Sequence, residues 1–347
     1  MPSPAQLHVD LNALAHNFHA LEAVAGVPVH PVVKADAYGL GIVPVARRLM
    51  REGARTFFVA RCAEGETLRE ALGPTPEIYV LDGCLDGRTE RLLAGDLRPV
   101  LNDAEQLARW PADVACGLQI DTGMNRLGFR LEDAPAPFPG VRLVLSHLAC
   151  ADAPAAPMNA RQRDAFEAVA RLYPGTVRSF ANSGGAFLKA DYGFDGVRPG
   201  ISLFGGGPEG RPDAGLKTVA TFTAEVLQVR DVPAGESVGY AATYRAETPR
   251  RIATCGAGYA DGVLRSSSPR GQVFVAGELR PMVGRVSMDV LAVDVTGLDV
   301  RAGDRVELFG PNRPIEDAAE AAGAIAYELL TAINRRVERM YTGAQAV

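Results

Sequence analysis

Between about residues 28 and 205, short apolar runs alternate with stretches in which apolar positions recur every three or four residues. The short runs are rich in Val, Ile and Phe and predict β-strands, whereas the periodic stretches predict amphipathic helices. Strands are expected at 29–34, 56–60, 77–81, 99–101, 115–120, 141–146, 177–181 and 197–202. Helices are expected at 42–53, 64–71, 104–110 and 158–172. Eight strands alternating with helices predict a closed α/β barrel of the TIM type.

The pattern changes after the run Gly205-Gly206-Gly207-Pro208 to strands separated by Gly and Pro turns. Strands are expected at 221–229, 251–255, 272–275 and 305–309, and one helix at 315–323. A chain of 347 residues with 47% hydrophobic residues exceeds what one core usually absorbs, so two domains are expected. We predict the barrel over residues 10–214 and a C-terminal mainly β domain over 215–347, joined by the N-terminal strand 1–9.

Composition and charge narrow the class of function. The net charge of -5 and the scattered Lys and Arg residues give no basic patch for nucleic acid. No apolar run is long enough to span a bilayer, so no membrane contact is expected. No Lys or Arg precedes Lys34, which is not the pattern of a secretory signal, so the cytoplasm is the expected location. The five cysteines form no CxxC pair, and neither a disulfide framework nor a metal site is predicted.

The most specific chemical feature is the segment PVVKADAYGLG at residues 31–41. A strand that ends in Lys34 places the amine at the catalytic mouth of a parallel barrel. Desolvation there lowers the pKa of an amine and fits it for a Schiff base with an aldehyde cofactor. The alternative is a lysine that only extends its ammonium group from an apolar strand into solvent.

A second chemical motif is Ala181-Asn182-Ser183-Gly184, which ends a predicted strand and opens a helix. Backbone N–H groups and the Ser183 hydroxyl can hold a phosphate at such a position. As a lone motif it is equally explained as a helix N-cap.

The segment around Lys34 closely resembles the pyridoxal-phosphate lysine motif of the alanine racemase family, and further motifs of that family follow in order along nearly the whole chain. The resemblance implies a pyridoxal 5'-phosphate enzyme that interconverts L-alanine and D-alanine by a two-base mechanism. Lys34 serves the D-isomer and Tyr240, in Val238-Gly239-Tyr240-Ala241, serves the L-isomer. It also implies a homodimer in which the β domain of one subunit completes the site of the other, and a role in supplying cell-wall precursors.

The resemblance assigns further residues to the cofactor. Those implied around it are Tyr38, His147, Asn182, Ser183, Arg198, Gly200, Ile201 and Tyr327. Arg198 faces the pyridine nitrogen, and because an arginine keeps its proton, the nitrogen stays neutral and transamination is restrained. A free phenol titrates near pH 10, so Tyr240 needs a partner, which is expected to be His147, itself linked to Arg198.

Other residues are assigned by resemblance to the substrate and its entrance. Arg126 binds the substrate carboxylate and the phenolic oxygen of the cofactor. The Met288 N–H reaches the same carboxylate, and Tyr259 narrows the entrance. The charged residues expected farther out are Asp152, Arg265 and Arg285, whose alternative reading is a surface ion-pair network.

Three positions depart from the family pattern. Gln119 replaces a lysine that is carbamylated in several members, and it is expected to orient Arg126 by an uncharged hydrogen bond. Ser179 replaces a common histidine, so the hydrogen-bond chain through Arg198 is expected to end differently. Val263 replaces a common aromatic residue, and a wider entrance is expected.

Three alternatives stay open at this point. A racemase of broader specificity, or one for serine, has the same motifs with a roomier pocket. A decarboxylase built on the same two domains is a further alternative, although the contexts of Tyr240, Arg198 and Arg126 resemble the racemases. A non-enzymatic pyridoxal-phosphate-binding protein shares the barrel and its lysine but lacks the second domain.

Overall fold

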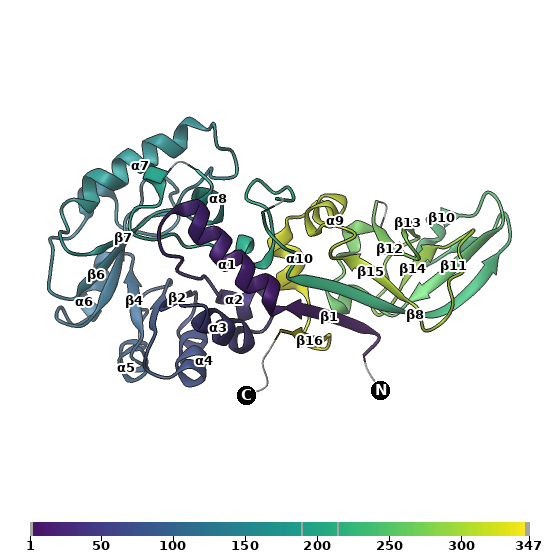
Figure 1. The fold of residues 1–347 in the computed structure, drawn as a ribbon, viewed down its shortest axis with the longest axis horizontal. Helices are drawn as coiled ribbons and strands as arrows, with labels where there is room; N and C mark the ends of the chain where they lie inside the picture. Colours follow the sequence, from purple (N-terminus) through teal and green to yellow (C-terminus); the bar gives the residue numbers. More distant parts are fainter. Residues whose placement is uncertain (1–2, 189, 214, 269, 344–347) are drawn as a thin grey trace. The chain divides into compact units, whose positions relative to one another are not determined.

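The structure is a computed structural model that describes residues 3–188, 190–213, 215–268 and 270–343. Contacts divide the chain into two compact units. We call Leu14–Leu203 with Gly207–Glu209 the barrel unit, and Met1–Ala13, Phe204–Gly206 and Gly210–Val347 the β unit. Figure 1 shows the elements of the barrel unit mainly in purple to teal and most strands of the β unit in green.

The barrel unit contains a six-stranded parallel sheet in the order β2-β3-β4-β5-β6-β7. Its strands are β2 (Thr56–Val59), β3 (Glu77–Val80), β4 (Arg98–Leu101), β5 (Cys116–Gln119), β6 (Val141–Leu145) and β7 (Val177–Ser179). Its helices are α2 (Lys34–Tyr38), α3 (Ile42–Arg51), α4 (Cys62–Leu72), α5 (Thr89–Ala94), α6 (Ala104–Arg109), α7 (Pro157–Ala170) and α8 (Ser183–Ala186), with α1 (Leu11–Ala25) before them. Six predicted strands and all four predicted helices are confirmed within a few residues.

Residues 29–33 and 197–199 close the barrel through isolated parallel bridges instead of regular ladders. Val32 pairs with Phe58 of β2, and Val29 pairs with Val197, so that residues 29–33 lie between β2 and residues 197–199. The Arg198 N–H donates to the carbonyl of Ala181, just beyond β7, at 2.8 Å. The two strands expected at 29–34 and 197–202 are therefore shorter extended segments, because prolines in both cannot donate to a ladder. The second one ends where the 3₁₀ helix Ile201–Phe204 begins, so the strand predicted through residue 202 is wrong there.

Apolar side chains from neighbouring strands fill the barrel. One buried cluster consists of Val32, Phe58, Tyr79, Val100, Leu143 and Leu145. The rings of Phe58 and Tyr79 stack with their centroids 5.3 Å apart. The interior is thus packed with side chains, so chemistry is confined to the ends of the strands.

The chain leaves the extended conformation at Lys34, so the prediction of a strand through this residue is wrong. Lys34 starts α2, in which Ala35, Asp36 and Ala37 have φ values of 53°, 56° and 52°, and Tyr38 also has a positive φ. Left-handed backbone costs roughly 1–2 kcal/mol for each residue other than glycine. Such a turn persists only where surrounding contacts fix it.

The β unit forms a closed antiparallel barrel in the order β8-β11-β14-β13-β12-β15, with β15 returning to β8. The long strand β8 also pairs with β1, which pairs in parallel with β16. The strands are β1 (Ala5–Asp10), β8 (Ala220–Val232), β9 (Ser237–Val238), β10 (Tyr244–Arg245), β11 (Arg250–Cys255), β12 (Gln272–Val275), β13 (Glu278–Val283), β14 (Leu291–Asp294), β15 (Arg305–Phe309) and β16 (Glu338–Thr342), with helices α9 (Ile315–Ala322) and α10 (Ala326–Ala332). This confirms the predicted mainly β domain.

Local turn chemistry explains several boundaries in the β unit. Ala276 and Gly277 both have positive φ between β12 and β13, as a two-residue hairpin turn requires. Gly323 ends α9 in the left-handed conformation, at the end of the helix predicted over 315–323.

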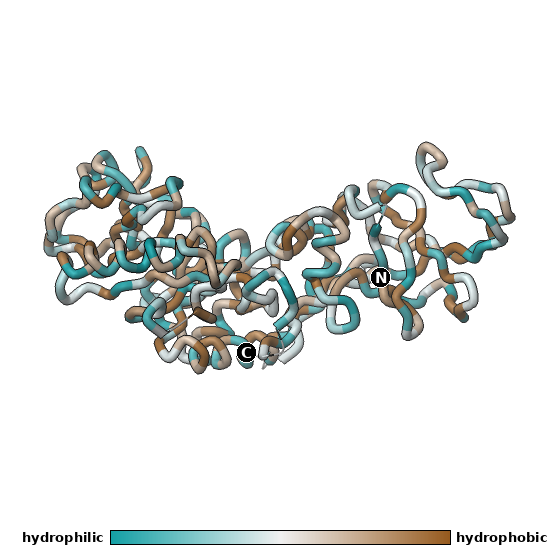
Figure 2. The backbone as a smooth tube through the Cα atoms, turned by 90° about the horizontal axis from the view of Figure 1, so that it is seen from above, coloured by the Kyte–Doolittle hydropathy of each residue, from teal (hydrophilic) through white to brown (hydrophobic). Residues whose placement is uncertain are grey.

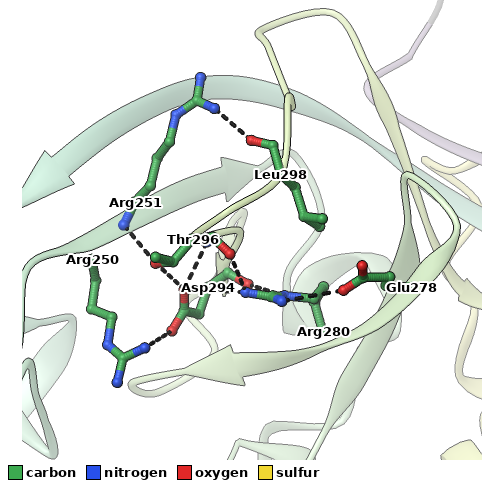
Figure 3. A network of polar contacts seen from close by, with 7 residues as sticks. All are labelled: Arg250, Arg251, Glu278, Arg280, Asp294, Thr296 and Leu298. Atoms are coloured by element: carbon green, nitrogen blue, oxygen red, sulfur yellow. Dashed lines mark hydrogen bonds and ion pairs between the residues drawn. The ribbon is translucent and has the colours of Figure 1, made fainter.

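A polar network ties the ends of three strands of the β unit together (Figure 3). The buried Asp294 carboxylate accepts hydrogen bonds from the N–H and hydroxyl of Thr296 at 2.9 and 2.5 Å. Arg280 donates to the carbonyls of Asp294 and Thr296, and Arg251 donates to the carbonyl of Leu298. Because backbone groups accept most of these bonds, the network fixes the course of the chain after β14.

Hydropathy along the backbone alternates over short distances, without a long uninterrupted apolar stretch (Figure 2). Among the described residues, no helix has the length and apolar character needed to cross a membrane.

Candidate active site

Lys34 lies at the strand ends of the barrel unit, and its ammonium group is partly buried. Burial lowers the pKa of Lys34, the positive charge of Arg126 lowers it further, and Glu64 acts in the opposite direction. The direction agrees with the desolvation inferred from the sequence. A lowered pKa raises the share of neutral amine, which is the form that attacks an aldehyde or accepts a proton.

His147 follows β6 and is surrounded by cations. Burial lowers the pKa of His147 to about 3, with additional lowering by Arg198, Arg126 and Lys34. The imidazole is therefore neutral at ordinary pH. Asn182 Nδ2 donates to His147 Nε2 at 3.4 Å, so that the two residues lie side by side.

Arg198 is buried and hydrogen-bonded through both terminal nitrogens of its guanidinium. Nη1 donates to Ser179 Oγ at 2.7 Å and Nη2 donates to the Ser146 carbonyl at 2.5 Å. Ser179 in turn donates to the Gly196 carbonyl at 2.7 Å. The hydrogen-bond chain that runs from Arg198 through Ser179 therefore ends at a backbone carbonyl. This agrees with the expectation that the chain ends differently where Ser179 replaces a histidine. The predicted direct link from Arg198 to His147 is wrong, because the bond goes to the carbonyl of the preceding residue.

Ser183, Gly200 and Tyr38 meet at a cradle of backbone N–H groups. Ser183 Oγ accepts hydrogen bonds from Gly200 N at 2.9 Å and from Ser202 N at 3.3 Å. A Cβ atom on Gly200 would lie 2.0 Å from the Tyr38 hydroxyl oxygen, so only glycine fits there. Asn182 caps the adjoining α8 by accepting from Gly185 N at 3.0 Å. Ile201, at the same turn, is buried.

Arg126 lies on an exposed loop after β5, and hydrogen bonds to Asp121 fix the start of this loop. Asp121 Oδ1 accepts from the N–H groups of Gly123, Met124 and Asn125, at 2.8 to 3.1 Å. The Gln119 amide donates to the Leu127 carbonyl at 2.9 Å. The expected hydrogen bond from Gln119 to Arg126 is therefore wrong. Gln119 holds the backbone next to Arg126, because its side chain emerges from β5 beneath the loop.

The β unit carries its own set of site residues. Gly239, beside Tyr240, packs against Arg285, with a built Cβ 3.4 Å from Arg285 N. Arg265 and Arg285 both line one cavity of about 520 Å³. Neither arginine, nor Asp152 of the barrel unit, forms an ion pair within the described ranges. The alternative of a surface ion-pair network thus finds no support there.

Tyr259 and Met288 lie on two paired backbone segments of the β unit. Tyr259 N donates to the Ser287 carbonyl at 3.0 Å, and Ala260 N donates to the Met288 carbonyl at 2.9 Å. The side chains of Tyr240, Tyr259, Met288 and Tyr327 are 69%, 44%, 53% and 41% exposed.

Val263 is buried and lines a cavity of about 40 Å³ together with Phe222 and Leu329. The expectation that Val263 widens the entrance is wrong for this side chain, because it faces the interior of the β unit.

Two further residues in the barrel unit were not found from the sequence. Glu64 accepts three backbone hydrogen bonds, one of them from Ala35 N next to Lys34. Gln162, fully buried on α7, accepts from Ala149 N and donates to the His147 carbonyl. A Glu at the third position of a helix is a capping signal, but the residue at the N-cap is Arg61, so the motif was not recognisable.

A parallel barrel with a lysine of lowered pKa at its strand ends, followed by a β barrel, defines the barrel class of pyridoxal-phosphate enzymes. Residues 9–208 match the family model for the alanine racemase N-terminal domain, and residues 219–341 match that for the alanine racemase C-terminal domain. The chain therefore belongs to the alanine racemase family. Membership confirms the family predicted from the motifs.

Similarity extends over the full chain. An alanine racemase of Rhizobium meliloti is 45% identical, with 99% of this chain and 98% of the relative covered. The biosynthetic alanine racemase of Agrobacterium fabrum is 42% identical, with 98% and 94% covered. The solved alanine racemase of Bartonella henselae, with covalently bound pyridoxal phosphate, is 36% identical with a TM-score of 0.91, and 98% of this chain and 100% of that one are covered.

Proposed function

We propose that this chain interconverts L-alanine and D-alanine with pyridoxal phosphate held at Lys34, and that Lys34 and Tyr240 move protons on opposite faces of the bound substrate. The observation that carries the proposal is the environment of Lys34. Its pKa is lowered by burial and by Arg126, and the anion cradle at Ser183 belongs to the same unit. These are the requirements of a lysine that reacts with an aldehyde carrying a phosphate.

The residues present fit the cofactor. Lys34, Arg126 and Arg198 all act as positive charges on His147, so an anionic group would relieve an excess of positive charge. Ser202 Oγ is buried without a hydrogen-bond partner in the described part of the chain, and it adjoins the cradle. Ser183, Gly200 and Ile201 would hold the phosphate, with the hydroxyls of Tyr38 and Tyr327 completing its shell.

Pyridoxal phosphate, when bound, supplies an electron sink that acidifies the α-proton of the amino acid. Arg126 binds the substrate carboxylate together with the Met288 N–H. The Lys34 amine accepts or returns the α-proton on the D-face, and the Tyr240 oxygen does so on the L-face. Neutral His147 is the hydrogen-bond partner of the Tyr240 hydroxyl.

Arg198 limits how strongly the bound cofactor acts as an electron sink. Its guanidinium donates to Ser179 Oγ and to the Ser146 carbonyl. With the cofactor bound, Arg198 would be the residue that faces the pyridine nitrogen. An arginine does not transfer its proton at ordinary pH, so the nitrogen stays neutral and proton return at the α-carbon is favoured.

The active form in this proposal is a homodimer. Tyr240, Tyr259 and Met288 are exposed on the β unit, and in the dimer they face the barrel unit of the partner subunit. A site built from two chains explains why these residues are exposed in a single chain, since the partner subunit would shield them from water in the dimer.

Alanine is the proposed substrate because the full-length relatives are alanine racemases. Broader specificity, including serine, stays an alternative. The matched C-terminal domain argues against the carrier protein that lacks one. A cytoplasmic location and a role in D-alanine biosynthesis for the cell wall remain part of the proposal.

The direct test incubates the purified holoprotein with a panel of single L-amino acids and separates the enantiomers by chiral chromatography. L-alanine is expected to reach an equal mixture, with Lys34→Ala as the inactive control. Faster inversion of serine would move the assignment to a serine racemase. Release of carbon dioxide without inversion would make the protein a decarboxylase, and no reaction would support a carrier.

A further inference from the structure

The turn that follows Lys34 needs a fixed anchor. Four consecutive residues, from Ala35 to Tyr38, have positive φ, and none of them is glycine. Local bonds help, since Gly39 N donates to the Ala35 carbonyl at 2.8 Å and Gly41 N donates to the Asp36 carbonyl at 2.9 Å. These bonds lie within the turn itself, so they do not set its direction relative to the barrel.

Glu64 on α4 connects this turn to the barrel. Its Oε1 accepts a hydrogen bond from Ala35 N at 2.7 Å. Its Oε2 accepts from Ala60 N at 2.8 Å and from Arg61 N at 3.0 Å. One carboxylate therefore joins the turn after Lys34, the end of β2 and the start of α4.

We propose that Glu64 is a positioning residue that directs Lys34 by holding the amide immediately after it. Ala35 N belongs to the peptide that follows Lys34, so the bond from this amide fixes the backbone that carries the lysine side chain. Glu64 is not a catalytic residue, because its oxygens are occupied by backbone donors. The inference rests on the proposed function, in which the Lys34 amine must reach one face of the substrate.

A simpler role as a helix cap accounts for only part of this geometry. The bond from Arg61 N is of the capping type, since Glu64 is the third residue of α4. The bond from Ala35 N is different, because Ala35 lies 29 residues before Glu64. A cap alone predicts that the loss of Glu64 disturbs α4 without altering the direction of Lys34.

Two variants separate these roles. In Glu64→Gln one carboxylate oxygen becomes an amide nitrogen, which cannot accept a hydrogen bond. Whichever way the amide is turned, the variant therefore loses either the bond from Ala35 N or the two bonds from Ala60 N and Arg61 N. Glu64→Asp keeps the charge and an acid near the start of α4, but its shorter side chain retracts from Ala35. The matched control is Glu70→Gln, an exposed acid on the same helix.

The first readout is amide hydrogen exchange of the holoprotein in the segment 34–41. Glu64→Gln and Glu64→Asp are expected to exchange faster there than the wild type and Glu70→Gln, with little change around α7. Unaltered exchange in this segment for both Glu64 variants would overturn the proposed anchor.

The second readout is the initial loss of the α-proton in deuterated water, under single-turnover conditions, from D-alanine and from L-alanine separately. The Glu64 variants are expected to slow the loss from D-alanine by about tenfold or more relative to that from L-alanine, because misplacing a reacting group is costly. Equal slowing on both faces, or no slowing, would contradict a positioning role. A wild-type protein that exchanges neither isomer would instead overturn the proposed function.

Discussion

The side chains nearest Lys34 carry more positive than negative charge. Burial lowers the pKa of Lys34 and of His147; Arg126 lowers that of Lys34 further, Arg198, Arg126 and Lys34 lower that of His147 further, and Glu64 acts in the other direction on Lys34. Burial, reinforced by this imbalance, keeps the imidazole neutral, and the imbalance favours an anionic ligand. The excess of positive charge arises because one lysine and two arginines lie near the strand ends with a single glutamate.

At the scale of single residues, the sequence predicted which residues belong to the site but not all of their hydrogen-bond partners. Lys34 was found because an amine at the end of an apolar strand fits a Schiff base, with the family motif favouring this role over a lysine extended into solvent, whereas Arg198 was assigned by the resemblance alone. The partners of Gln119 and Ser179 were not predictable, since both donate to backbone carbonyls, at Leu127 and Gly196. A carbonyl is present at every residue, so no sequence signal identifies the one that accepts.

His30 gives a prediction about stability and pH. Burial lowers the pKa of His30 to about 4, with Arg198 lowering it further, and Nδ1 has no partner among the described residues. The unfolded chain therefore binds a proton between about pH 6.5 and 4 that the folded chain does not, so stability falls as the pH falls through this window. His30→Leu should remove a slope of up to about 1.4 kcal/mol per pH unit from the free energy of unfolding in urea.

His19 is the control with the opposite sign. Hydrogen bonds to Glu52 and Glu22 raise the pKa of His19, so its contribution is present below its unfolded pKa and is lost as the pH rises. The effect of His19→Gln should be small, because the side chain is 53% exposed and its pairs are screened. A His30→Leu variant with the same pH slope as the wild type would show that His30 does not resist protonation.

At the scale of elements, hydropathy predicted the inner strands and the outer helices. It failed at the two segments that close the barrel, because Pro31 and Pro199 remove ladder donors. It also failed at α2, because a left-handed turn of Ala, Asp and Tyr contradicts local preference and is fixed by distant contacts such as Glu64.

Helix α7 positions the segment around His147 through one buried side chain. Gln162 Oε1 accepts from Ala149 N at 2.9 Å, and Nε2 donates to the His147 carbonyl at 3.0 Å and to Thr122 Oγ1 at 3.2 Å. Thr122 precedes the Arg126 loop. One amide therefore couples the His147 segment to the strand end that carries Arg126.

Gln162→Met should destabilise the fold by about 1–3 kcal/mol, since it leaves buried backbone groups without partners. Racemisation per folded molecule should also fall, because His147 and the Arg126 loop lose their common support. The free energy of unfolding and kcat/KM are to be measured on the same preparations.

The matched control is Gln106→Met on α6. Gln106 is also buried and bonds to the backbone at Asn102 and Asp82, and neither of these partners is a proposed site residue. A similar loss of stability without loss of kcat/KM is expected. Unchanged activity in Gln162→Met, or equal losses in both variants, would contradict the positioning role of Gln162.

At the scale of the whole molecule, each unit closes its own barrel but holds only part of the residue set. Lys34, Arg126, His147 and Arg198 belong to the barrel unit, whereas Tyr240, Tyr259 and Met288 belong to the β unit. The proposed homodimer combines the two sets across subunits. Sequence motifs indicated both sets, but hydropathy carries no information about which chain completes a site.

Mixing two inactive variants tests the shared site. In a heterodimer of Lys34→Ala and Tyr240→Phe chains, one composite site has both lesions and the other has neither. Activity of purified heterodimers should therefore return to about half that of the wild-type dimer. Heterodimers as inactive as the parent variants would indicate that each site lies within one chain.

The central claim, two bases on opposite faces, is tested most directly by α-proton loss from each enantiomer in Tyr240→Phe. Steady-state kcat/KM is unsuitable, because the enantiomers have equal free energy and any variant must give equal values in both directions. In deuterated water, under single-turnover conditions, proton loss from L-alanine should fall by about 10²–10⁴-fold while loss from D-alanine, taken by Lys34, continues near the wild-type rate. Equal losses from both enantiomers would contradict the assignment of one base to each face.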